Sequence, residues 1–83
     1  MRLFSWNVNG VRAIEKKGFL TWVDSTSPDI LCIQETKANF DQLPESLQNI
    51  HGYHGYWHSG VRKGYSGVAT FCKHEPLDVQ YVL

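Results

Sequence analysis

The sequence has no long apolar run, no excess of charge of either sign and only two cysteines among its 83 residues. No stretch approaches the ~18 consecutive apolar residues of a membrane-spanning helix, and the N-terminus lacks the apolar core of a secretory signal. Cys32 and Cys72 lie in apolar segments without the spacing of a C-x-x-C motif or a Cys/His ligand pair, which argues against a disulfide framework and a zinc site. These absences predict an intracellular protein without a membrane segment.

Apolar residues make up 42% of the chain and aromatic residues 13%, which is enough to form a core and argues against a disordered chain. The length allows one domain at most. Eight Lys and Arg residues balance eight Asp and Glu residues, so the net charge gives no argument for nucleic-acid binding. Basic residues nevertheless gather in two short stretches, at 12–17 and 62–73.

The first half of the chain has the pattern of a strand, a helix and a second strand. Residues 2–8 alternate with the period of a strand, residues 11–24 have helical spacing with a break predicted at Gly18, and residues 30–33 form an apolar run typical of a buried strand. Such a unit normally places its two strands parallel, with a right-handed connection. The carboxyl ends of both strands are then expected at the same edge of one sheet.

The second half predicts one more helix and a group of strands. A helix is expected over residues 42–49, capped by Asp41 and with Pro44 tolerated in its first turn. Strands are expected over residues 53–59, 65–73 and 77–83, the first two forming a hairpin. Because the alternation continues to the last residue without a turn or cap, we expect the sheet to belong to a longer protein.

Polar side chains gather where the first two predicted strands end, at Asn7, Asn9, Gln34, Glu35 and Lys37. Ligands of open α/β sheets bind at this edge, which makes it the first place to look for a site. Glu35 is the only carboxylate of the group, and a lone carboxylate with amide neighbours suits a hard cation such as Mg²⁺. On position alone, the alternative is that Glu35 is a solvated residue at a strand end and that both asparagines form turns.

Three sequence blocks resemble the exonuclease III family of abasic-site endonucleases: SWNVNGVRA at residues 5–13, PDILCIQETK at 28–37 and GYSGVA at 64–69. The resemblance covers essentially the whole chain, and one block alone would indicate only the wider DNase I-like phosphoesterase superfamily. It implies an α/β (α+β) fold, the N-terminal portion of a two-sheet, four-layer sandwich with a mixed sheet and flanking helices. Because the family has roughly 250 residues or more, residues 1–83 would be an incomplete domain, about its first third.

The resemblance also implies an activity and roles for individual residues. Members of the family cut double-stranded DNA 5′ to an abasic site and trim 3′ ends with magnesium, or alternatively manganese. We expect a monomer that acts in the cytoplasm, on the nucleoid if the source is bacterial. The residue matching Glu35 is the metal ligand, and the residue matching Asn7 is a catalytic residue that also arranges the metal and phosphate. The position of Asn9 is Asn or Asp among relatives, and Asn removes a possible second carboxylate. Residues near the DNA are those matching Arg12, Lys17, Lys37, Gly64 and Tyr65.

The sequence lacks the later family blocks that carry a catalytic aspartate, an active-site tyrosine and an Asp-His pair. We therefore expect the isolated chain to be inactive, and to fold poorly without the second sheet that would cover the first. Two alternatives remain open. One is a non-catalytic fragment that binds DNA through Arg12, Lys17, Lys37, Arg62 and Lys63. The other is a superfamily phosphoesterase that acts on a lipid or inositol phosphate.

Overall fold

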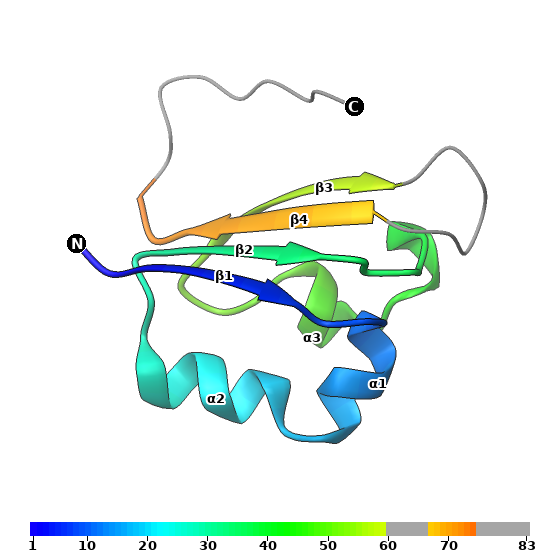
Figure 1. Ribbon diagram of the computed structural model, residues 1–83, viewed down its shortest axis with the longest axis horizontal. Helices are drawn as coiled ribbons and strands as arrows, with labels where there is room; N and C mark the ends of the chain where they lie inside the picture. Colours follow the sequence, from blue (N-terminus) through cyan, green and yellow to red (C-terminus); the bar gives the residue numbers. More distant parts are fainter. Residues whose placement is uncertain (60–66, 75–83) are drawn as a thin grey trace.

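A computed structural model of the chain describes residues 1–59 and 67–74, with the side chain of Ser59 left aside. The elements in chain order are β1 (Leu3–Asn7), α1 (Val11–Lys16), α2 (Phe19–Thr26), β2 (Ile30–Gln34), the 3-10 helix η1 (Phe40–Gln42), α3 (Glu45–Gln48), β3 (His54–Ser59) and β4 (Gly67–Cys72). The strands form one mixed sheet in the order β1-β2-β4-β3 (Figure 1). This arrangement confirms the predicted α/β class with a mixed sheet and flanking helices.

The strand–helix–strand unit is present as the sequence predicts. β1 and β2 pair in parallel from Leu3 opposite Ile30 to Asn7 opposite Gln34. The predicted helix is divided at Gly18, whose φ of 98° lies in the left-handed region that glycine adopts without strain. Asn7 and Gln34 are the last residues of their strands, so they lie within the sheet and not beyond it as expected.

The predicted helix over residues 42–49 is wrong in its extent and its cap. Asp41 lies inside η1, and α3 begins only at Glu45 with Pro44 as its N-cap residue. The backbone is extended at Leu43, with φ −89° and ψ 149°, because proline disfavours the helical conformation in the residue before it. The helix is therefore interrupted, and Asp41 is too far along the chain to cap α3.

The predicted hairpin is confirmed for the described residues. β3 and β4 pair antiparallel from His54 opposite Cys72 to Ser59 opposite Gly67. β4 also pairs antiparallel with β2, which places β2 and β4 at the centre of the sheet. The predicted start of the strand at Tyr65 and the predicted strand over residues 77–83 lie outside the described residues.

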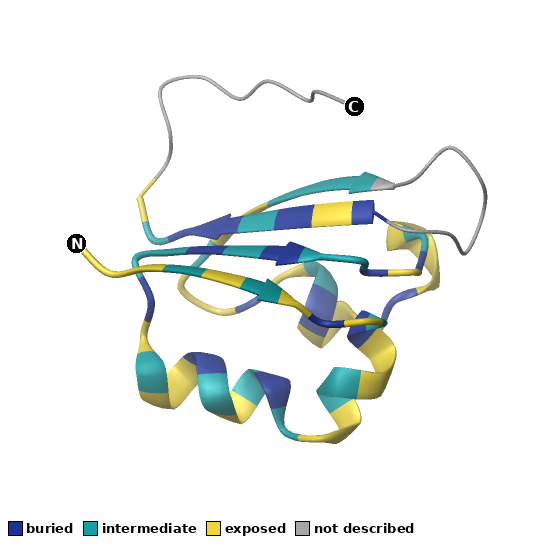
Figure 2. Cartoon of the chain, in the orientation of Figure 1, coloured by how far each residue is buried: buried dark blue, intermediate teal, exposed yellow. Residues whose placement is uncertain are grey.

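The core lies between one face of the sheet and the helices, all of which pack on that face (Figures 1 and 2). The sheet contributes Leu31, Ile33 and Phe71, each at most 1% exposed. The three tryptophans expected in the core are partly buried and pack against it. The rings of Trp6 and Trp22 meet edge to face with centroids 5.0 Å apart. The other buried members of the core are Val8, Val11, Phe19, Val23, Ala38, Leu43, Leu47, Ile50 and Ala69.

The opposite face of the sheet carries a less uniform set of side chains. Leu3 is 65% exposed and Val68 is 45% exposed on this face. Cys32 and Cys72 are free thiols, and burial raises the pKa of the Cys72 thiol. In the described part of the chain, no helix is long and apolar enough to span a bilayer.

Candidate functional site

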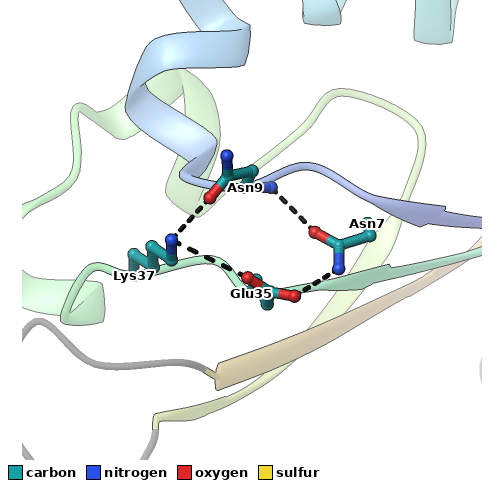
Figure 3. Close-up of polar contacts among 4 residues, drawn as sticks. All are labelled: Asn7, Asn9, Glu35 and Lys37. Atoms are coloured by element: carbon teal, nitrogen blue, oxygen red, sulfur yellow. Dashed lines mark hydrogen bonds and ion pairs between the residues drawn. The ribbon is translucent and has the colours of Figure 1, made fainter.

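Four polar side chains form a closed ring at the carboxyl ends of β1 and β2 (Figure 3). The side-chain amide of Asn7 donates to Oε2 of Glu35, and its Oδ1 accepts from the backbone N–H of Asn9 at 3.0 Å. Nζ of Lys37 donates to Oδ1 of Asn9 at 2.5 Å and lies 3.7 Å from Oε1 of Glu35. We call these four residues the Glu35 corner.

Backbone hydrogen bonds hold the two segments of this corner together beyond the strands. Three N–H groups that follow β1 donate to carbonyls at and after the end of β2: Val8 to Gln34 at 3.1 Å, Gly10 to Glu35 at 2.7 Å and Val11 to Thr36 at 2.9 Å. The N–H of Thr36 donates to the carbonyl of Gly67 at 3.2 Å, which ties the corner to β4 as well. The parallel pairing of β1 and β2 thus continues into the site.

Three residues of the corner have a backbone conformation that residues other than glycine rarely adopt. The φ angles of Asn9, Glu35 and Lys37 are 48°, 54° and 52°. Asparagine tolerates this left-handed region, whereas Glu and Lys adopt it at a cost of order 1–2 kcal/mol each. Such strain persists only where the surrounding hydrogen bonds impose it, and it is frequent at functional sites.

The corner has a donor set that fits a hard divalent cation. The side chains of Glu35 and Lys37 are 41% and 43% exposed, so both can reach a ligand from solvent. The described residues hold no group of three or more His, Cys, Asp or Glu side chains that could enclose a metal. Glu35 therefore offers a single carboxylate, which suits Mg²⁺ because this ion keeps several waters and takes few protein ligands beside substrate phosphate.

The structure brings together only some of the residues predicted for the site. Asn7, Glu35 and Lys37 meet as described, and Asn9 joins them. Arg12 in α1 and Lys17 directly after it are exposed, and neither has a hydrogen bond or ion pair to the four corner residues within the described ranges. The other predicted DNA contacts, Gly64 and Tyr65, lie outside the described residues, as do the basic Arg62 and Lys63.

Sequence reasoning did not single out Thr36. Its side chain is 1% exposed, and its hydroxyl has no hydrogen-bond partner among the described residues. Its backbone links Val11 of α1 to Gly67 of β4 through the hydrogen bonds above. A polar residue between two charged ones carries no sequence signal of burial, so only the fold identifies this contact.

A second carboxylate with a lysine partner lies at the other end of the sheet. Oδ2 of Asp29 accepts from the backbone N–H of Arg2 at 2.7 Å, and Oδ1 lies 4.0 Å from Nζ of Lys73. The hydrogen bond from Arg2 lowers the pKa of Asp29, with Lys73 acting in the same direction. We call these three residues the Asp29 corner. A cavity of about 580 Å³ opens beside it between α2 and α3, and no residue of the Glu35 corner lines that cavity.

Known proteins resemble this chain in sequence along nearly its full length. Residues 4–82 match the sequence model of the Endonuclease/Exonuclease/phosphatase family. The chain is 51% identical over 83 residues to the DNA repair nuclease APEX1 of Danio rerio, covering 98% of this chain and 27% of the relative. It is 48% identical over 82 residues to an exodeoxyribonuclease of Bacillus subtilis, covering 98% of this chain and 31% of the relative.

Solved structures agree with the sequence relatives. An AP endonuclease from Archaeoglobus fulgidus matches 98% of this chain and 30% of its own with 37% identity and a TM-score of 0.79. The 3′ phosphatase NExo from Neisseria, bound to a product DNA hairpin, matches 100% of this chain and 31% of its own with 34% identity and a TM-score of 0.79. The chain thus spans less than a third of the length of these relatives. Sequence, fold and the placement of Glu35 agree, and the chain belongs to the Endonuclease/Exonuclease/phosphatase family.

Proposed function

We propose that this chain supplies the cation-holding corner of an exonuclease III-type DNA repair phosphodiesterase. The observation that carries the proposal is the Glu35 corner, which lies at the carboxyl ends of two parallel strands in a chain about half identical to a DNA repair nuclease and an exodeoxyribonuclease. The substrate would be double-stranded DNA, cut 5′ to an abasic site or trimmed at a 3′ end. The protein would act as a monomer in the cytoplasm, on the nucleoid if it is bacterial.

Each corner residue has a role that follows from its contacts. Glu35 would hold Mg²⁺, or Mn²⁺ in its place, and the bound ion would offset charge on the phosphoryl oxygens. Asn7 fixes the orientation of the Glu35 carboxylate through its amide, and this position beside the cation would also bring it to the phosphate. Lys37 is close enough to the corner to contact DNA backbone, and Arg12 and Lys17 would add positive charge from α1 and its end.

The described residues provide no group for the remaining chemistry. Hydrolysis of a phosphodiester needs a positioned water and a base that takes its proton. Glu35 is the only carboxylate of the corner, and it would be occupied by the cation. We therefore propose that the 83 residues alone do not cut DNA, because removing members of a cooperating catalytic unit costs several orders of magnitude in rate.

A chimera tests the proposal. The matching segment of the Bacillus subtilis exodeoxyribonuclease is replaced by this chain, and incision of a labelled duplex with one abasic site is measured with Mg²⁺ or with chelator. We expect Mg²⁺-dependent incision that falls about a thousandfold or more in Glu35→Gln. The matched control is Glu45→Gln, which removes an exposed carboxylate at the start of α3 and should leave the rate unchanged.

Other outcomes would select the alternatives. Full incision by the Glu35→Gln chimera would contradict the proposed cation role. Salt-dependent DNA binding without incision would favour a non-catalytic DNA-binding fragment. Hydrolysis of an inositol or lipid phosphate in preference to abasic DNA would favour the wider superfamily. The blocks at residues 28–37 and 64–69 argue against that last reading, because they resemble the abasic-site endonucleases.

A further inference from the structure

Lys37 does not project freely toward solvent but is held inside the Glu35 corner. Its Nζ donates to Oδ1 of Asn9 at 2.5 Å and lies 3.7 Å from Oε1 of Glu35 (Figure 3). Its backbone has a φ of 52°, so an uncommon conformation directs this side chain toward the corner. A lysine that served only as a solvated charge would need neither the anchor nor the backbone strain.

The two oxygens of the Glu35 carboxylate have different partners. Oε2 accepts from the side-chain amide of Asn7, and this hydrogen bond leaves Oε1 as the oxygen for an additional ligand. Lys37 lies beside that same oxygen. An ammonium and a divalent cation repel each other and would compete for one carboxylate oxygen.

We propose that Lys37 is a tethered counter-ion of Glu35 that leaves the carboxylate when a divalent cation binds and is then available to a DNA phosphate. Cation binding and DNA binding are thereby coupled through one side chain, and by thermodynamic linkage each strengthens the other. This inference rests on the proposed function for the existence of the cation site, and it adds the role of Lys37 in regulating that site.

Asn9 suits the role of a releasing anchor. Its neutral amide oxygen accepts a hydrogen bond from Lys37 without adding a second negative charge. Both members of the Lys37–Glu35 pair are more than two-fifths exposed, and exposed pairs of this kind are weak. A pair this weak is one that a divalent cation displaces, while it still balances the charge of Glu35 when no cation is bound.

Manganese binding by the 83-residue chain tests the competition. Free Mn²⁺ is measured by electron paramagnetic resonance at low salt, with TMAO present to favour the compact state, and near-ultraviolet circular dichroism checks each variant for native packing. We expect Lys37→Gln to bind Mn²⁺ about two- to fivefold more tightly, the range that an exposed ion pair implies. Lys37→Arg keeps the charge and should bind as the unchanged chain does. The matched control is Lys16→Gln, which removes an exposed charge from the last turn of α1.

The outcomes separate this inference from the proposed function. Loss of Mn²⁺ binding in Glu35→Gln without tighter binding in Lys37→Gln would overturn the inference and leave the cation site intact. Absence of Mn²⁺ binding in the unchanged chain and in Lys37→Gln would overturn both. Equal tightening in Lys37→Gln and Lys16→Gln would reduce the effect to overall charge and overturn the inference.

The coupling to DNA has a separate readout. Anisotropy of a labelled duplex gives the ratio of DNA affinities with and without Mn²⁺. We expect this ratio to be about twofold or more higher in the unchanged chain than in Lys37→Gln, and unchanged in Lys16→Gln. The same ratio in all three proteins would show that Lys37 does not connect the two ligands.

Discussion

The sheet has a lysine–carboxylate pair at each end, and the two pairs differ in what else holds the carboxylate. In the Asp29 corner, the carboxylate accepts a backbone hydrogen bond from Arg2, and the backbone N–H of Lys73 donates to the carbonyl of Asp29 at 3.0 Å. In the Glu35 corner, the hydrogen bonds to the carboxylate come from side chains alone. The nitrogen–oxygen distances of the pairs are similar, 4.0 Å and 3.7 Å.

The difference separates a structural pair from one that can exchange its partner. Asp29 stabilises the start of β1 and the end of β4, so its hydrogen bonds are part of the fold. Glu35 has partners that can move by rotating side chains, while its own backbone is held in a left-handed conformation by hydrogen bonds to the β1–α1 connection. A rigid backbone that presents a side chain with replaceable partners is what a ligand site requires.

The largest expected effect contrasts the two carboxylates directly. In the chimera with the Bacillus subtilis enzyme, Glu35→Gln should reduce incision of an abasic duplex about a thousandfold or more, because it removes the cation ligand. Asp29→Asn should retain incision within about twofold at a temperature at which the protein stays folded. Equal losses in steady-state incision assays would remove the functional distinction between the corners.

The core beneath both corners should not distinguish them. Phe71→Ala removes a ring that is 1% exposed at the centre of the sheet, and we expect it to lower the free energy of unfolding of the chimera by about 3–5 kcal/mol. Val68→Ala is the matched control on the same strand, because Val68 is 45% exposed on the other face and should cost under about 1 kcal/mol. Urea unfolding followed by tryptophan fluorescence measures both, and equal costs would show that the two faces are equally buried.

A smaller effect concerns the segment that leads into the Asp29 corner. The hydroxyl of Tyr53 donates to the carbonyl of Pro28 at 2.6 Å, and Tyr53→Phe should lower the free energy of unfolding by about 1 kcal/mol. Burial raises the pKa of Tyr53 above its usual 10.0, so its contribution is present below that pH and is lost as pH rises through the folded value. Alkaline unfolding monitored by circular dichroism checks this, and identical curves for the two proteins would contradict it.

The smallest expected effect is the acid dependence of Asp29. Its pKa is lowered from 3.8 in the folded protein, first by the hydrogen bond from Arg2 and then by Lys73. The stability that Asp29 contributes is therefore present above the unfolded value and is lost as pH falls through the folded one. Urea midpoints of Asp29→Asn should lie below those of the unchanged protein at about pH 6 and converge with them toward about pH 2. A constant difference across that range would contradict the assigned cause.

Sequence reasoning reached the first half of this fold because local signals there agree with one another. Alternation predicts β1, the apolar run predicts β2, and Gly18 marks the division between α1 and α2. It failed over residues 42–49 because the effect of Pro44 on Leu43 outweighs the helical spacing of the apolar residues. Weak periodicity around a proline predicts a helix poorly.

The candidate site shows the same limit at the level of side chains. Parallel pairing of the first two strands is enough to predict that Asn7 and Glu35 lie close together. The contact between Lys37 and Asn9 depends on three positive φ angles, and the burial of Thr36 depends on β4. These features arise from hydrogen bonds between segments distant in the sequence, so no local pattern indicates them.

The most direct test of the account is to locate a bound cation on the chain itself. Mn²⁺ broadens the amide nuclear magnetic resonance signals of residues near its site, and a titration of the isotope-labelled chain would map that broadening. The account predicts that the signals of Asn9, Glu35 and Lys37 are lost first, while those of Asp29 and Lys73 persist. Broadening centred on the Asp29 corner, or spread equally over both ends of the sheet, would contradict the assignment of Glu35 as the cation ligand.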